Sequence, residues 1–320
     1  SKVLLEFDQT ISEQVIYTIT LNGVADCSLN ATTLVEQFVI ATSAVPGDII
    51  INEILSDAVT GGADFIEIRN NTDKLIELKD LEVANYDDDT IANHKLVEVN
   101  YVLGAKDFVV ITPDSSFQKL QYTSSVPGKF IEMSLPTMSN DSGTVFIIQN
   151  NVVLDKVSYE DDWQFALLND SDGKSLERID PLGPSNDINN WHTASETVGF
   201  ATPGRENSQL MYGETNGVLS LSKDIFSPDN DGNEDILQLN YSMINTGMVA
   251  NASIYDDRGR LVKSLLKAEL IGNEGTITWD GVNDNLQKAS IGAYILIFEA
   301  FDLEGNSFVK RLAFVLAGKF

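Results

Sequence analysis

The chain has 320 residues, 43% of them hydrophobic, and its 48 acidic and 21 basic residues give a formal net charge of −27. This length and apolar content suit two or three domains with packed cores and exclude wholesale disorder. A strongly negative field without a Lys/Arg cluster repels phosphate backbones, so we expect no nucleic-acid partner.

Cysteine usage and hydropathy exclude two further classes. Cys27 is the single cysteine, so the chain is not a disulfide scaffold, and we expect a buried apolar residue rather than a catalytic thiol. No stretch approaches the roughly 20 consecutive apolar residues of a membrane helix, so we expect no membrane insertion. No signal peptide opens the sequence, so for an exported protein we expect a targeting segment upstream.

Short apolar runs with period-two character and frequent Gly, Asn, Asp and Pro breaks predict an all-β fold built from sandwiches. The clearest runs are 49–51, 65–68, 108–111, 145–148, 294–298 and 312–316. Brief helical turns fit Thr33–Phe38 and Ser115–Leu120. Tight hairpin turns are predicted at Asn150-Asn151, Asp256–Gly259, Glu304–Asn306 and, after a core Trp279, at Asp280-Gly281.

Two Pro/Gly-marked segments, Ala41–Asp48 and Ala201–Asn207, divide the chain. The first piece, before the first of these segments, is too short to bury a core of its own. The predicted parts are a first piece at 1–45, a middle domain at 46–208, a linker at 209–216 and a C-terminal domain at 217–320.

The first piece carries the strand-like runs Tyr17–Leu21 and Phe38–Ile40 on either side of Gly23–Asn30. In this order they resemble the closing strands of a surface-layer-type bacterial immunoglobulin-like domain, although Leu29 stands where that family usually has a glycine. The resemblance implies a truncated domain, and the alternative is that the piece packs on its neighbour.

The middle block contains an ordered set of short motifs: Ile50–Ile54, Asp64–Asn70, Asp107–Ile111, Leu154–Tyr159, Gly173–Arg178, Asn190-Trp191 and Thr202–Asn207. Through them, residues 48–207 resemble a bacterial lamin-tail domain, which is a compact immunoglobulin-like β-sandwich. The resemblance implies a binding or spacing unit of a secreted protein. The filament and chromatin roles of animal lamins do not carry over, because the chain has no heptad rod and no basic face.

Three charged residues of these motifs, Glu53, Glu67 and Arg178, are expected to form a polar cluster, because a partly buried carboxylate needs a partner. A catalytic acid/base pair of Glu53 and Glu67 is the weaker alternative, since the sequence indicates neither a cleft nor a substrate.

Three ring side chains of the same block are expected to be structural. Trp163 and Trp191 are predicted to seal the sandwich, with their ring N–H groups bonded to an acceptor. His192 is predicted to be a structural polar residue rather than a metal ligand, because no second His or Cys lies at ligand spacing.

The C-terminal block carries the motifs Phe226–Asp235, Ile254–Val262, Thr278–Gly281 and Gly292–Tyr294. They resemble the immunoglobulin-like C-terminal modules of exported Bacteroidetes proteins, close to both the gliding-motility-associated domain and the flagellar-hook-capping-type fold. The resemblance implies either a sorting signal that partners the type IX secretion machinery or a retained domain. The fold class is therefore immunoglobulin-like β-sandwiches in tandem.

One constellation in this block suggests metal chemistry. Asp229, Asp231, Asn233 and Asp235 place oxygen atoms at alternate positions around Gly232, as Ca²⁺ coordination requires. A solvated acidic turn that caps a strand remains the alternative. The run Asp87–Asp89 lacks a glycine and is predicted to be a solvated loop.

These observations predict a non-catalytic C-terminal fragment of a multidomain exported protein, secreted or at the cell surface. Its role is structural or interaction display, with secretion sorting as a second role of the C-terminal block. The alternative is an accessory module that binds a glycan or protein partner beside an upstream hydrolase. A hydrolase acting through the middle domain is the weakest hypothesis.

Overall fold

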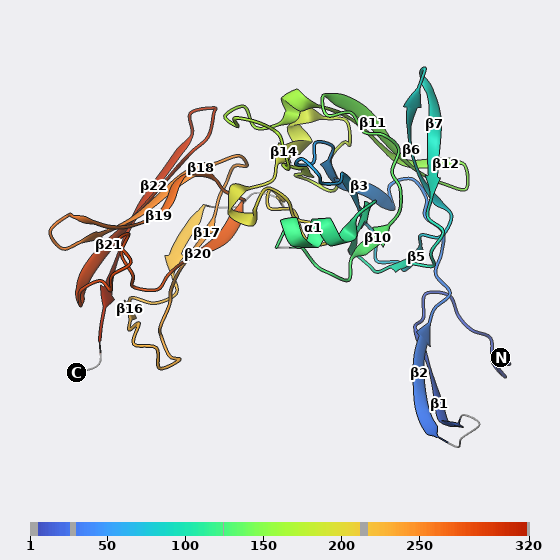
Figure 1. Cartoon of the computed structure of the whole chain (residues 1–320), viewed down its shortest axis with the longest axis horizontal. Coiled ribbons are helices and arrows are strands. Elements are labelled where there is room, and N and C mark those ends of the chain that lie inside the picture. The colour runs from blue at the N-terminus through green and yellow to red at the C-terminus, as the bar shows by residue number, and fades with distance from the viewer. Residues whose placement is uncertain (1–5, 26–29, 124, 212–216, 319–320) are drawn as a thin grey trace.

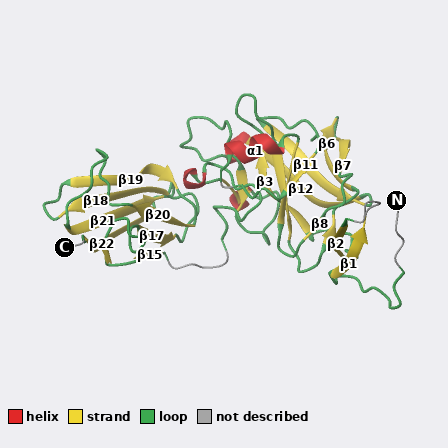
Figure 2. Ribbon diagram, turned by 60° about the horizontal axis from the view of Figure 1, so that its bottom comes forward, coloured by secondary structure: helices red, strands yellow, loops and turns green. Residues whose placement is uncertain are grey.

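The computed structural model describes residues 6–25, 30–123, 125–211 and 217–318, which form an arched arrangement of a hairpin and two β-sandwiches (Figure 1). Strands dominate the described residues, as Figure 2 shows, so the all-β prediction is confirmed. Cys27 lies outside the described residues, and its predicted burial stays a prediction. No described helix is both long and apolar enough to cross a membrane.

The N-terminal hairpin pairs β1 (Tyr17–Ala25) with β2 (Ala31–Phe38) and projects away from the middle of the molecule (Figure 1). The helical turn predicted at Thr33–Phe38 is wrong. Apolar residues there have helix-like spacing, but antiparallel pairing with β1 satisfies the backbone of the segment instead.

The middle sandwich packs a six-stranded sheet against a four-stranded sheet. Its main core takes inward-facing residues from both sheets, for example Ile51, Ile68, Val83 and Ile147. The six-stranded sheet has the order β10 (Phe130–Glu132), β9 (Phe108–Thr112), β4 (Phe65–Asn70), β3 (Ile49–Leu55), β13 (Leu176–Arg178), β14 (Trp191–Thr193). The four-stranded sheet has the order β12 (Val152–Glu160), β11 (Ser142–Gln149), β6 (Leu81–Asp87), β7 (Thr90–Leu96).

Smaller elements complete the middle sandwich: β5 (Ile76–Glu77) paired with β8 (Val102–Leu103), α1 (Ser115–Gln121), and the 3₁₀ turns η1 (Asp161–Trp163), η2 (Ile188–Asn190) and η3 (Glu196–Val198). Helix α1 confirms the predicted turn at 115–120. The Asp114 side chain caps it by accepting a hydrogen bond from the Phe117 N–H.

The C-terminal sandwich packs a three-stranded sheet against a five-stranded sheet. Phe226, Trp279, Tyr294 and Phe314 form an aromatic group in its core. The three-stranded sheet has the order β15 (Val218–Leu221), β17 (Leu237–Ser242), β20 (Glu274–Trp279). The five-stranded sheet has the order β16 (Ile225–Phe226), β22 (Ser307–Leu316), β21 (Gly292–Phe301), β18 (Val249–Asp256), β19 (Leu261–Leu270).

Three of the four predicted hairpin turns join strands that pair. Asn150 and Asn151 have φ of 53° and 60° between β11 and β12, the left-handed conformation that this tight turn requires. The turns at Asp256–Gly259 and Glu304–Asn306 join β18 to β19 and β21 to β22. The hairpin predicted at Asp280-Gly281 is wrong, because β20 pairs with β17 and the chain then crosses to the other sheet. Trp279 is buried as predicted.

The two sandwiches are joined by a packed connector, residues 207–211. Phe165 of the middle sandwich packs on Val249 and Leu270 of the C-terminal one. The Gln209 side-chain amide donates to the carbonyl groups of Thr193 and Ile271, one in each sandwich. The Asn273 Nδ2 group donates to the Gln209 and Leu210 carbonyls at 2.8 and 3.0 Å. The connector is therefore part of the folded structure.

Candidate functional site

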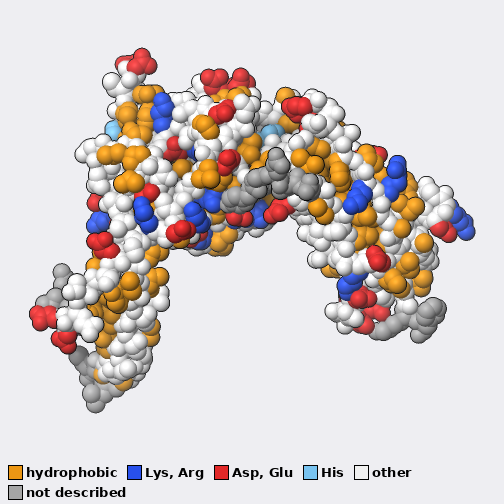
Figure 3. Space-filling model, turned by 180° about the vertical axis from the view of Figure 1, so that it is seen from behind, with side chains coloured by type: hydrophobic (Ala, Val, Ile, Leu, Met, Phe, Trp, Pro, Cys, Tyr) orange, Lys and Arg blue, Asp and Glu red, His pale blue; other side chains and the backbone are white. Residues whose placement is uncertain are grey.

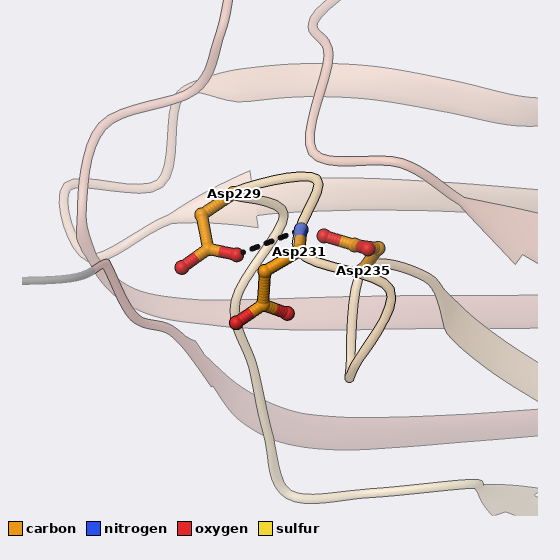
Figure 4. A group of neighbouring side chains, drawn as sticks. All are labelled: Asp229, Asp231 and Asp235. Carbon is orange, nitrogen blue, oxygen red and sulfur yellow. Dashed lines mark hydrogen bonds between the residues drawn. The ribbon is translucent and has the colours of Figure 1, made fainter.

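The acidic loop, residues 229–235, lies between β16 and β17 in the C-terminal sandwich. One carboxylate oxygen each from Asp229, Asp231 and Asp235 lies within 4.8 Å of the others (Figure 4). Asn230, Gly232 and Glu234 have positive φ angles, which fold the segment tightly enough to bring alternate side chains together. The structure thus brings together the three predicted aspartate ligands.

Main-chain groups of the acidic loop bond to the same carboxylates. Asp235 accepts the N–H groups of Asn230 at 2.5 Å and Gly232 at 2.8 Å, and Asp231 accepts that of Asn233 at 2.9 Å. The oxygen atoms of the three aspartates fit Ca²⁺, which prefers carboxylate and carbonyl oxygens as ligands. These same bonds also describe an acidic turn that stabilises itself, so both interpretations from the sequence stay open.

The run Asp87–Asp89 is exposed: Asp87 ends β6, and Asp88 and Asp89 form the turn to β7. Asp88 and Asp89 have φ of 45° and 62°, and the Thr90 hydroxyl donates to the Asp87 carbonyl. This placement agrees with the predicted solvated loop.

The buried glutamate cluster, Glu53, Glu67 and Glu177, is the second concentration of carboxylates. Strands β3, β4 and β13 of the six-stranded sheet supply one residue each, and all three have no exposed surface. The motifs predicted Glu53 and Glu67 in a polar cluster, but not Glu177. No local signal marks Glu177, because charged residues make up most of Leu176-Glu177-Arg178, a composition typical of an exposed segment.

Segment 202–209 supplies most of the hydrogen bonds to this cluster. Glu53 accepts the Thr202 N–H at 2.8 Å, and Glu67 accepts the Gly204 N–H at 2.5 Å. Glu177 accepts the Thr202 hydroxyl at 2.5 Å, the Ser208 hydroxyl at 2.8 Å and the Gln209 N–H at 2.9 Å. The cluster therefore fastens the chain segment that leads into the connector.

Burial and mutual repulsion raise the pKa values of these carboxyl groups. Burial, followed by the charge of Glu177, raises the pKa of Glu53 to about 8. Burial, followed by the charge of Glu53, raises the pKa of Glu67 well above its usual range. Burial also raises the pKa of Glu177, against the opposing effect of its hydrogen bonds.

Arg178 does not join the glutamates, contrary to the expectation from sequence. It is 1% exposed and forms an ion pair with Asp155 at 3.0 Å, while its Nε donates to the Ile51 carbonyl. Neighbouring strand residues point to opposite faces of a sheet, which separates Arg178 from Glu177. The guanidinium instead lies over the Trp191 ring.

The ring residues have structural environments. Trp191 is buried in the main core and its ring N–H donates to the Ser185 carbonyl at 2.9 Å, while Trp163 packs against that core partly buried. The His192 Nδ1–H donates to the Thr193 carbonyl at 3.0 Å, and burial lowers the pKa of His192. His192 faces the C-terminal sandwich at Gly247, beside the connector.

Acid/base chemistry needs a carboxyl group that a substrate reaches. The two cavities beside the connector do not include the buried glutamates in their walls. Each glutamate is enclosed and accepts donors from the protein itself. The buried glutamate cluster therefore has a structural geometry: it fastens segment 202–209 to the six-stranded sheet.

The fold and these sites define a protein of tandem immunoglobulin-like β-sandwiches. Residues 42–161 match the family model of the Lamin Tail Domain, which places that domain in the middle sandwich. The structure adds β13, β14 and segment 202–209 to the same sandwich, beyond the matched residues.

Solved structures show distant likeness only. CopC from Methylosinus trichosporium OB3b is 18% identical with a TM-score of 0.24, covering 33% of this chain and 97% of that one. PorU from Porphyromonas gingivalis is 11% identical with a TM-score of 0.25, covering 94% of this chain. PorZ, a surface component of the type IX secretion system of the same organism, is 12% identical with a TM-score of 0.25, covering 90% of this chain.

The chain spans 24% of the PorU structure and 33% of the PorZ structure. No curated protein sequence matches the chain.

Proposed function

We propose that this chain is a non-catalytic display segment of an exported, multidomain bacterial surface protein. Its work is to hold binding or structural parts at a fixed separation outside the cell. The observation that carries the proposal is the connector. Buried glutamates hold its beginning, and Gln209 and Asn273 bond it to the C-terminal sandwich. A net charge of −27 also suits a protein that stays dissolved outside the cell.

The proposed domain limits are 1–45, 46–208 and 217–320, with a linker at 209–216. For the first piece we propose the closing strands of an immunoglobulin-like domain. Its hairpin leaves apolar side chains uncovered, as Figure 3 shows, among them Val24, Leu34 and Val35 at 47%, 45% and 57% exposure. A two-stranded hairpin is marginal by itself, so further strands of that domain would stabilise it.

A spin-label distance measurement tests the rigid connector. Leu120 and Leu286 are 82% and 85% exposed, one in each sandwich, and accept labelled cysteines in a Cys27→Ser background. We expect one narrow distance distribution, as broad as that of a label pair within one sandwich. A broad distribution would contradict a spacer of fixed geometry.

For residues 217–320 we further propose a sorting role in type IX secretion, supported by the motif resemblance given above. Fusing this segment to a fluorescent reporter in a bacterium that has the machinery tests it. Export that depends on the machinery is the expected result, and retention in the periplasm would leave the segment as an ordinary domain.

A further inference from the structure

A cavity of about 440 Å³ lies between the two sandwiches, beside the connector. Arg205 and Glu206 form one wall and the connector another, and strands β17 and β20 close the opposite side. This volume is within the range of small-molecule sites, and sites commonly lie where domains meet. Neither the acidic loop nor the buried glutamates line the cavity, although Ser208 of its wall donates to Glu177.

Two buried polar atoms in the walls have no hydrogen-bond partner among the described residues. They are the carbonyl oxygen of the Asn273 side chain and the Nε of Arg205. Asn273 is 6% exposed, and its Nδ2 group already donates to two carbonyls of the connector, which fixes the orientation of the amide. Buried polar groups in proteins are normally paired, so an unpaired acceptor and an unpaired donor on two residues of the same walls indicate a missing polar partner.

The charges of the walls restrict the chemistry of that partner. Arg205, Glu206 and Glu274 line the cavity, and among the described residues none of them forms an ion pair. Two carboxylates and the overall charge of −27 disfavour an anion, and the Nε–H group of Arg205 needs an acceptor, which a simple cation does not offer. A neutral ligand that both donates and accepts hydrogen bonds satisfies all three groups.

Apolar side chains complete the site. Val198, Leu210 and Met243 lie in the same walls, beside the hydroxyl groups of Ser208 and Ser242. A sugar ring presents hydroxyls around its edge and C–H groups on its faces, which matches a wall of mixed polar and apolar character.

We propose that the cavity between the sandwiches binds a neutral sugar unit of a glycan. The hydroxyls of the sugar donate to Asn273 and to the two glutamates and accept from Arg205. Both atoms are covered in this structure, so binding requires the partly exposed Arg205 side chain to shift while the Asn273 amide keeps its two bonds to the connector. This site adds a binding activity to the display role and does not depend on it.

Titration of the full chain with simple sugars tests the proposal. Glucose, galactose, mannose and N-acetylglucosamine serve as neutral probes, with glucuronic acid and glucosamine as charged comparators, followed by saturation-transfer NMR and calorimetry. We expect at least one neutral sugar to bind with a Kd of about 1 mM or tighter, and the charged comparators to bind more weakly.

Two variants assign the binding to this cavity. Arg205→Met and Glu274→Gln change partly or fully exposed side chains, and each should weaken sugar binding about 10-fold or more, with the melting temperature unchanged. Arg311→Met removes an exposed arginine from β22, outside the cavity, and should bind as the original chain does.

The proposal is overturned if none of the neutral sugars binds at about 20 mM, well above the expected Kd. It is also overturned if both cavity variants bind unchanged, or if a charged comparator binds best. None of these results affects the spin-label distances, so failure of the sugar site is distinguishable from failure of the display role.

Discussion

The buried glutamate cluster and the acidic loop contain three carboxylates each and differ in almost every physical respect. In the cluster, sheet strands enclose the groups, whose pKa values are raised by burial and which accept hydrogen bonds from segment 202–209. In the loop, the groups lie at the surface and bond to their own turn. Carboxyl groups thus fasten a buried chain segment in one sandwich and form a candidate cation site in the other. The difference arises because burial decides whether a carboxyl group keeps its charge.

The largest loss of stability is expected when the buried glutamate cluster loses the hydrogen-bond acceptor Glu177. Glu177→Ala leaves the Thr202 and Ser208 hydroxyls and the Gln209 N–H without their carboxylate. The free energy of unfolding of the middle sandwich should fall by about 3 kcal/mol or more, because unpaired buried donors are costly. Urea denaturation followed by tryptophan fluorescence measures it. Glu160→Ala, at an exposed glutamate of β12, should change it by less than about 0.5 kcal/mol.

The raised pKa of Glu53 gives a second, smaller effect, a dependence of stability on pH. The pKa of Glu53 is about 8 in the folded protein against an ordinary value of 4.5, so the folded state holds the proton longer than the unfolded state. Its contribution to stability is complete below pH 4.5 and is lost as the pH rises through about 8.

Glu53→Gln carries no titrating proton and should flatten this slope. At pH 9 the variant should be more stable than the original chain by on the order of 1–3 kcal/mol, with little difference at pH 5. Denaturation across that pH range measures the change, with Glu160→Gln as the control. A slope that survives in Glu53→Gln would show that the proton resides elsewhere.

Calcium is the test that belongs to the acidic loop. If the loop binds Ca²⁺, the melting temperature of the C-terminal sandwich should rise by about 5 °C at roughly ten times the Kd, and a chelator should reverse the rise. Asp231→Ala should abolish the difference, while Asp257→Ala, in the turn between β18 and β19, should preserve it. A melting curve that ignores calcium would leave the loop as a self-stabilised turn.

The smallest effect is expected at the other acidic run. Asp88→Asn removes a charge from the exposed turn between β6 and β7 and keeps a residue type that tolerates positive φ. The free energy of unfolding should change by less than about 0.5 kcal/mol. A loss above about 1 kcal/mol would assign this turn a structural contact that its exposure does not suggest.

Local sequence determined much of the fold. Alternating apolar runs specified the strands, and Asn150-Asn151 specified a hairpin because asparagine tolerates the left-handed backbone. The order of motifs in the middle block indicated a lamin-tail domain, and the family match at 42–161 supports this for the middle sandwich. The spacing of Asp229, Asp231 and Asp235 around Gly232 predicted their clustering, because such spacing acts within one turn.

Only the tertiary structure decided the features that depend on pairing between distant segments. Sheet order, rather than turn chemistry, sent the chain across sheets after Trp279 and paired 33–38 with β1. It also brought Glu177 beside Glu53, although 124 positions separate them, since neighbouring strands supply both residues. Burial, pKa and the cavity at the connector arise from such long-range packing, which no local pattern of residues encodes.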